Sequence, residues 1–144
     1  MTAQMDSVPM LVICGQQVTW MLGKDAFQEA DIFGITVPVV KHNYLVKETN
    51  DLVRVAKEAY HIATTGRPGP VLIDVPKDVS SGDFTESMDP ELDLPGYDPY
   101  ESLNIDPSRI EEAVALIKKA KRPVILAGQG TMISRADKLS LIHI

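Results

Sequence analysis

Cysteine is nearly absent from the sequence, since Cys14 is the single one among 144 residues. An internal disulfide is therefore impossible, which is consistent with a reducing compartment. No apolar run approaches the roughly 20 residues that a membrane-spanning helix needs. The first residues also lack the basic segment of a secretory signal. We therefore expect a cytoplasmic, globular protein without a membrane partner.

Basic residues are also scarce: 14 Lys and Arg stand against 20 Asp and Glu, a formal net charge of -6. Non-specific nucleic-acid binding depends on cations that contact phosphates, so this balance disfavours a nucleic-acid partner. No cluster of Cys, His, Asp and Glu has the spacing of metal ligands, and no metal site is predicted. No serine or cysteine stands in the sequence context of a catalytic nucleophile.

What the chain does contain is an alternation of strand and helix patterns. The apolar run 8–14 is typical of a strand buried on both faces, as parallel strands are, and Cys14 is expected to be a small buried residue within it. Residues 16–24 predict a loop, 25–31 predict a short helix, and 36–46 include a strand.

The clearest helix is 49–65, whose apolar residues recur at helical spacing: Leu52, Val55, Ala56, Ala59 and Ala63. Gly66 supplies its stop. Residues 71–75 follow as another buried strand. Strand, helix and strand in alternation predict an α/β fold with a parallel sheet.

Residues 79–105 change character, because Asp, Glu, Pro and Tyr dominate them without useful periodicity. We interpret them as a linker, since a structureless loop of that length is unusual inside one compact domain. Asp106 is a good N-cap and Pro107 fits a first helical position, so a second α/β unit is predicted from 106 onward. The buried stripe of its helix is expected to be Ile110, Ala113, Val114 and Ile117.

The second unit is predicted to continue with a strand at 123–127 and a helix that starts near Ser134. The turn between them, 128–130, reads Gly-Gln-Gly and lacks the third glycine of a dinucleotide fingerprint, so it is weak evidence for nucleotide binding. Residues 139–144 do not continue the helical pattern, and we expect a truncation point there.

Two cations flank the strand 71–75. Arg67 stands between a helix stop and a Pro-Gly-Pro turn that restricts its direction, and its planar guanidinium suits a phosphate, a carboxylate or a ring carbonyl. Lys77 follows the strand at the end where open α/β sheets bind ligands. An exposed loop arginine is equally compatible with the first context, and a solvated lysine beside Asp78 is the simpler interpretation of the second.

Phe27 and Gln28 lie together in the segment 25–31. The Gln28 amide offers two donors and an acceptor, which can orient a substrate without proton transfer. Phe27 could wall an apolar pocket. A core phenylalanine beside a surface glutamine is the interpretation that spacing alone prefers.

Taken in order, several motifs resemble the large catalytic subunit of acetolactate synthase (acetohydroxyacid synthase), a thiamine-diphosphate-dependent enzyme family. The motifs are Asp6-Ser7-Val8-Pro9, Gly15-Gln16, Asp25-Ala26-Phe27-Gln28-Glu29-Ala30-Asp31, Gly34-Ile35-Thr36, Lys41-His42-Asn43-Tyr44-Leu45-Val46-Lys47, Thr64-Thr65-Gly66-Arg67-Pro68-Gly69-Pro70-Val71 and Asp74-Val75-Pro76-Lys77-Asp78-Val79. The ordered set is specific, whereas Gly-Arg-Pro-Gly-Pro alone is shared by many thiamine-diphosphate enzymes. The stretch 17–20 departs from the usual Val-Pro-Thr type sequence, and the resemblance connects this loop with inhibitor access.

The resemblance implies a role for each matching residue. Gln28 would contact the intermediate bound to thiamine diphosphate, Phe27 would line the same pocket, and Lys77 would lie near the channel to the active site. Arg67 would bind FAD, which is structural in this family. The implied reaction condenses two pyruvates, or pyruvate and 2-ketobutyrate, to an acetohydroxyacid with release of CO2, in branched-chain amino-acid biosynthesis. The implied partners are copies of the catalytic subunit in a homodimer or tetramer, and a small regulatory subunit.

The resemblance also implies a domain order: 1–78 as the C-terminal half of a pyrimidine-binding domain, 79–105 as a linker, and 106–144 as the truncated start of the central, FAD-associated domain. The activating glutamate of the family would lie before the first residue, and the site for Mg2+ and diphosphate after the last. The chain alone is therefore expected to be inactive. Two alternatives stay open: a fragment of another thiamine-diphosphate enzyme, of the glyoxylate carboligase or sulfoacetaldehyde acetyltransferase type, and a non-catalytic α/β binding module.

Overall fold

The computed structural model describes residues 1–95, 105–136 and 138. The chain divides into two compact units, Met1–Leu103 and Asn104–Ile144. No helix within the described residues is long and apolar enough to cross a membrane.

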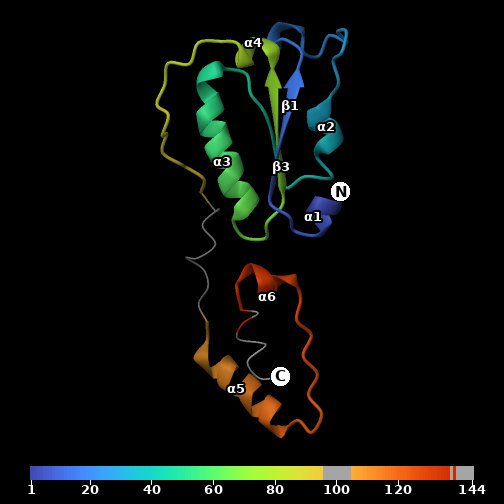
Figure 1. Ribbon diagram of the computed structural model, residues 1–144, viewed down its shortest axis with the longest axis vertical. Helices are drawn as coiled ribbons and strands as arrows, with labels where there is room; N and C mark the ends of the chain where they lie inside the picture. Colours follow the sequence, from blue (N-terminus) through green and yellow to red (C-terminus); the bar gives the residue numbers. More distant parts are fainter. Residues whose placement is uncertain (96–104, 137, 139–144) are drawn as a thin grey trace. The chain divides into compact units, whose positions relative to one another are not determined.

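The first unit is built on a parallel sheet in the order β1 (Met10–Gln16), β3 (Pro70–Pro76), β2 (His42–Leu45). The central strand β3 pairs with both neighbours, so that Cys14 and Leu45 are both in register with Asp74. Helix α3 (Leu52–Thr64) packs on one side of the sheet and α2 (Ile32–Thr36) on the other (Figure 1). The α/β fold with a parallel sheet, as predicted, is confirmed.

Short elements complete this unit. They are α1 (Thr2–Met5), the 3-10 turns η1 (Thr19–Met21) and η2 (Thr49–Asp51), and α4 (Lys77–Ser80). Two of them stand at the carboxyl ends of strands: η1 follows β1 after a short loop, and α4 follows β3 directly. They therefore surround the edge of the sheet where a site was expected.

The core lies between α3 and the sheet. The buried apolar side chains of α3 pack against those of β3 and of Val46: Val55, Ala59, Ile62, Ala63, Val71 and Ile73. Of the predicted stripe on α3, Val55, Ala59 and Ala63 are buried and Leu52 is half-buried, whereas Ala56 is exposed. Ile62 is an additional buried member. The helix ends at Thr64, and Gly66 follows its C-cap with a φ of +61°, a backbone conformation that glycine adopts without strain.

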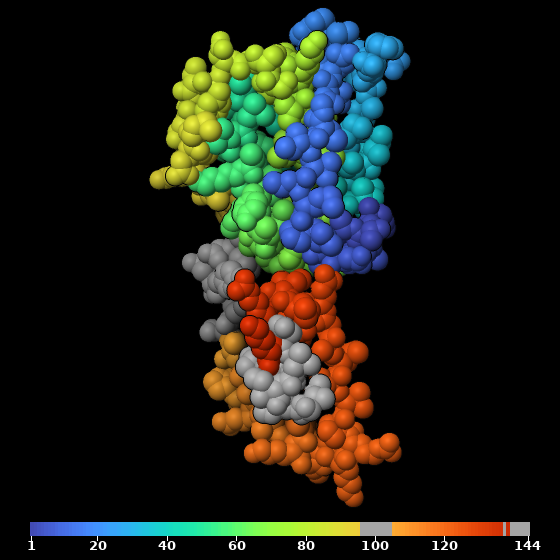
Figure 2. Space-filling model, in the orientation of Figure 1, coloured from blue at the N-terminus to red at the C-terminus, as the bar shows by residue number. Residues whose placement is uncertain are grey.

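Strand β1 differs from the prediction, because it is not buried on both faces. Leu11 and Ile13 lie on the α3 side of the sheet, in register with Val71 and Ile73, yet they are 39% and 71% exposed. Helix α3 packs mainly over β3 and leaves the β1 end of this face uncovered (Figure 2). Cys14 is half-buried and not in a disulfide.

The predicted helix at 25–31 is wrong. This segment forms turns, with positive φ angles at Asp25 and Gln28, and α2 begins only after Asp31, whose carboxylate caps it by accepting from the Gly34 N–H at 2.8 Å. The strand expected within 36–46 is limited to β2, because α2 and a turn occupy the residues before it.

The first part of 79–105, the predicted linker, makes several contacts with the first unit. Val79 is buried in the core, and Thr85 and Asp89 are tied to the α3 region by Asn50 (N–H to Oδ1, 2.9 Å) and by Lys57 (Nζ to Oδ1, 2.6 Å). The stretch up to residue 95 therefore packs on the first unit. Residues 96–104 lie outside the described residues, and the assignment of 79–105 as a linker stays a prediction.

The second unit begins with α5 (Pro107–Lys119), as predicted, with the Asp106 carboxylate accepting from the Ser108 N–H at 2.9 Å. Its expected buried stripe is exposed instead. The expected strand at 123–127 is wrong, since these residues are irregular and Leu126 is 98% exposed. A strand needs a hydrogen-bonded neighbour, and the described part of this unit supplies none.

The last helix, α6 (Gln129–Ile133), begins earlier than the expected start near Ser134. It follows the Gly128 turn directly, and Thr131 Oγ1 donates to the Gly128 carbonyl at 2.7 Å. The predicted truncation point at 139–144 lies outside the described residues.

Candidate functional site

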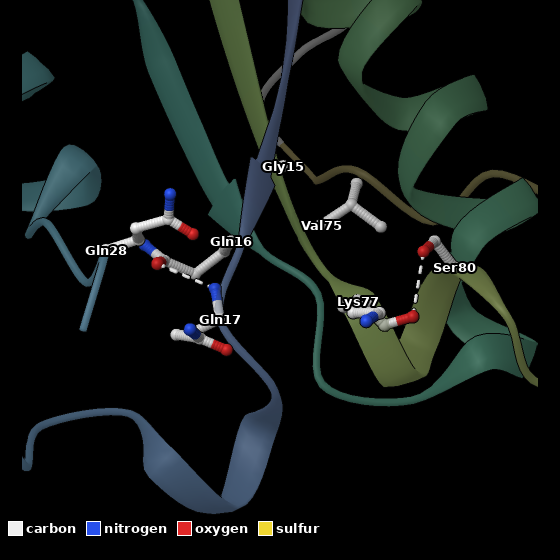
Figure 3. Close-up of a pocket in the computed structure, with 7 residues that line it drawn as sticks. All are labelled: Gly15, Gln16, Gln17, Gln28, Val75, Lys77 and Ser80. Carbon is white, nitrogen blue, oxygen red and sulfur yellow. Dashed lines mark hydrogen bonds between the residues drawn. The ribbon is translucent and has the colours of Figure 1, made fainter. Parts of the chain in front are cut away.

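A cavity of about 450 Å³ lies at the carboxyl ends of β1 and β3. Its lining comes from three stretches: Gly15, Gln16 and Gln17 after β1, Gln28 from the following turns, and Val75, Lys77 and Ser80 around the end of β3. In Figure 3 the glutamines lie on one side and Lys77 with Val75 and Ser80 on the other. The structure therefore brings Gln28 and Lys77, two of the predicted site residues, to one cavity.

Gln28 is carried by a turn whose backbone is held at several points. The Gln17 side-chain Nε2 donates to the Phe27 carbonyl at 2.6 Å. The Glu29 carboxylate accepts from the Ala26 N–H at 2.8 Å and from the Gly23 N–H. These backbone donors, that of Ala26 first, lower the pKa of Glu29, so it is the ionised carboxylate that holds the turn.

Lys77 owes its place to the end of β3. It is the first residue of α4, directly after Pro76, and its carbonyl accepts from Ser80 Oγ at 2.9 Å. Pro76 is fully buried and fixes the exit direction of the strand. The backbone that carries the lysine thus directly continues the central strand of the sheet.

The chemistry of the lining is that of an anion or carbonyl site. Among the seven lining residues Lys77 is the charged one, and the three glutamine side chains offer amide donors and acceptors. An ammonium group beside amides can bind a carboxylate and orient a neighbouring carbonyl. The lining holds no carboxylate or imidazole that could move a proton.

Two other predicted site residues lie elsewhere. Phe27 is next to the cavity in sequence but is 81% exposed and does not line it. Arg67 lies before β3, at the opposite end of the strand from Lys77, where its Nε donates to Ser7 Oγ at 2.8 Å and its Nη2 to the Met5 carbonyl at 2.9 Å. A strand of this length separates the two cations by roughly 20 Å, so they do not share a site.

Sequence reasoning did not single out Gln16, Gln17 and Ser80 as site residues. The available signal was their position, since polar residues directly after a buried parallel strand lie at the ligand-binding edge of such sheets. Within the described residues, no three His, Cys, Asp or Glu side chains come together as metal ligands.

Comparison with known proteins finds relatives named as acetolactate synthase large subunits. The chain is 51% identical over 136 residues to the acetolactate synthase large subunit of Corynebacterium glutamicum, which covers 94% of this chain and 21% of that subunit. It is 51% identical over 128 residues to that of Lactococcus lactis subsp. lactis, covering 89% of this chain and 22% of the subunit. No protein-family model matches the chain.

The fold is also found in a larger solved structure. Benzoylformate decarboxylase from Polynucleobacter necessarius superposes with a TM-score of 0.70 at 24% identity, over 94% of this chain and 24% of that one. At this identity the likeness establishes the fold alone. The chain spans about a fifth of the length of the curated relatives it matches. Over nearly its whole length, this chain is homologous to part of the acetolactate synthase large subunit.

Proposed function

We propose that this chain is part of the catalytic subunit of an acetolactate synthase, and that its cavity is part of the wall that holds the 2-ketoacid substrates. The observation that carries the proposal is that Gln28 and Lys77, brought together from distant parts of the sequence, line one cavity beside two further amides. The 51% sequence identity to two acetolactate synthase large subunits supports the same assignment.

In this proposal each residue has a limited task. The Lys77 ammonium attracts the carboxylate of pyruvate or 2-ketobutyrate, and the Gln28 amide orients the carbonyl beside it. Gln17 holds the Gln28 turn through the Phe27 carbonyl. Phe27, exposed at 81%, supplies an apolar surface next to the cavity. The product is an acetohydroxyacid, and CO2 leaves.

The cofactors implied by the homology are thiamine diphosphate, Mg2+ and FAD. The lining fits the substrate-facing side of a thiamine diphosphate site, because its donors are amides and one ammonium. When bound, that cofactor supplies the electron sink for decarboxylation. Arg67 keeps Nη1 available after its bonds to Ser7 and Met5, which fits a donor to FAD. The described residues offer no ligand set for Mg2+.

The chain alone is proposed to have no turnover. Its cavity contains binding and orienting groups, and its seven lining residues include no carboxylate or imidazole. The parent subunit is proposed to act in the cytoplasm as a homodimer or tetramer, with a small regulatory subunit as a further partner. The domain assignments given from the sequence belong to the same proposal.

Two measurements on the 144-residue chain test this function. Acetolactate formation from pyruvate, with thiamine diphosphate, Mg2+ and FAD supplied, is expected to be absent, and measurable turnover would overturn the proposed inactivity. Titration of the 15N-labelled chain with pyruvate is expected to displace the resonances of Gln28 and Lys77. A set of displaced resonances that excludes both residues would remove the cavity from the substrate site.

A further inference from the structure

The face of the sheet opposite α3 carries a buried polar layer. Since Val71 and Ile73 pack against α3, the alternation of the strand places Leu72 and Asp74 on the other face, toward α2 and the turns before it. Asp74 is 1% exposed there. Burying a carboxyl group in the central strand costs free energy unless hydrogen bonds compensate for the lost water contacts.

Gln16 links this carboxyl group to the loops of the candidate site. Its Nε2 donates to Asp74 Oδ2 at 3.1 Å and to the Ala30 carbonyl at 2.8 Å, while its Oε1 accepts from the Gln17 N–H at 2.9 Å. A carbonyl can only accept and a backbone N–H can only donate, so the two backbone partners fix the orientation of this amide. Asp74 Oδ2 therefore acts as an acceptor.

The remaining oxygen of Asp74, Oδ1, is buried and has no hydrogen-bond partner. Burial raises the pKa of Asp74, the hydrogen bond from Gln16 opposes this, and the nearby Asp31 carboxylate raises it further. Relative to an exposed carboxyl group, these surroundings favour the neutral form of Asp74, and Oδ2 accepts from Gln16.

The bridge contacts the backbone on both sides of Gln28. Gln16 binds the Ala30 carbonyl, and Gln17, whose N–H is bound by Gln16, donates its own side-chain amide to the Phe27 carbonyl at 2.6 Å. Gln28 itself has a φ of +61°, a conformation that costs a non-glycine residue energy and persists where its surroundings impose it.

We propose that Asp74 is a positioning residue: through Gln16 it holds the turn 27–30 in the conformation that presents Gln28 to the cavity. Asp74 does not line the cavity and would not touch a ligand there. The inference rests on the proposed function only for the role of Gln28 as a ligand contact. That Asp74 holds the turn 27–30 is a statement about the ligand-free chain.

The test is a comparison of side-chain amide resonances in the 15N-labelled chain without ligand. Asp74→Asn keeps an acceptor oxygen for Gln16 and is expected to leave the Gln28 resonances close to their original positions. Asp74→Leu removes the acceptor and is expected to displace the Gln16 and Gln28 resonances several-fold further than Asp74→Asn does. The Asn50 amide, which binds Thr85 away from α2, serves as an internal reference and should stay in place.

Ile73→Val is the matched control, because it removes one methylene from the same strand on the face that packs against α3. It should leave the Gln28 resonances unchanged, and this result would separate a positioning role of Asp74 from a general loss of packing. The proposal is wrong if the Gln28 resonances keep their positions in Asp74→Leu. It is also wrong if Asp74→Asn displaces them as far as Asp74→Leu does. If Asp74→Leu does not fold, Gln16→Met breaks the bridge from its half-exposed end, and an undisplaced Gln28 there overturns it equally.

Addition of pyruvate to the same samples keeps the two proposals separate. Displacement of Gln28 by Asp74→Leu without ligand supports the positioning role even where pyruvate does not bind. Pyruvate binding that is equal in the original chain and in an Asp74→Leu variant with displaced Gln28 resonances would overturn the role of Gln28 as a ligand contact and leave the positioning role standing.

Discussion

Thr19 and Asp78 join the loop after β1 to the first turn of α4. The Thr19 N–H donates to Asp78 Oδ1 at 3.0 Å and to Oδ2 at 3.2 Å, and the Thr19 hydroxyl donates to Oδ2 at 2.6 Å. These bonds, that of the hydroxyl first, lower the pKa of Asp78. The contact closes the segment 17–21 against the strand end that carries Lys77.

Thr19→Val tests this contact. The variant keeps the backbone donor and loses the hydroxyl, so the unfolding free energy at pH 7 is expected to fall. An acid with a lowered pKa in the folded state stabilises above its unfolded pKa of about 3.9 and loses that contribution as the pH falls through the folded value. The difference between variant and original should therefore shrink toward pH 3 in urea unfolding. Thr64→Val, whose hydroxyl binds its own helix, should show no such pH dependence.

Asp74→Asn is expected to have the opposite pH dependence. Because burial raises the pKa of Asp74, the folded state holds this proton more tightly than the unfolded state. Its stabilising contribution is then full below about pH 3.9 and is lost as the pH rises through the folded value. The variant should gain stability relative to the original chain between pH 4 and the folded pKa, and denaturant unfolding across that range measures it. A difference independent of pH would show that Asp74 is ionised normally.

Gly66→Ala is expected to cost about 1–2 kcal/mol of unfolding free energy, because an L-residue is strained at a φ of +61°. A β-carbon at this position would meet nothing within 4 Å, so the effect is conformational and not steric. Gly66→Asn should lose less, since asparagine tolerates this region better. Gly15→Ala, with equally open space and an ordinary φ, is the control for thermal unfolding. Equal losses in both alanine variants would contradict this account.

Ile62→Ala removes a side chain that is 2% exposed in the core between α3 and the sheet. A cavity there is expected to cost about 2–5 kcal/mol, measured by denaturant unfolding. Ile35→Ala, at a residue that is 66% exposed, should change stability by no more than about 0.5 kcal/mol. Similar losses at both positions would mean that α3 does not anchor the fold.

Lys77→Met is expected to weaken pyruvate binding by about tenfold or more, since a charge-assisted hydrogen bond contributes roughly 1.5–3 kcal/mol. Pyruvate binding is measured as the displacement of the Gln28 resonances during titration. Lys57→Met removes a cation that pairs with Asp89, away from the cavity, and should leave pyruvate binding unchanged. An equal loss in the two variants would point to net charge and not to the cavity.

The sequence was sufficient where local physics decides the structure. The stripe and stop of α3, the strand β3 and the N-cap of α5 each depend on residues within a few positions of one another. The placement of Lys77 at a strand end followed from the same patterns. The family resemblance, read from ordered motifs, was confirmed by homology over nearly the whole chain.

Tertiary structure decided what depends on distant partners. The segment 25–31 has helix-forming residues, yet the Glu29 carboxylate and the side chain of Gln17 hold it in turns. The exposure of Ile13 is set by where α3 packs, and the expected strand at 123–127 lacks a neighbour among the described residues. The bridge from Asp74 through Gln16 to Ala30 joins three separate segments, so no local pattern could predict it. Hydrogen bonds between residues far apart in sequence depend on the register of the sheet, which brings those residues together.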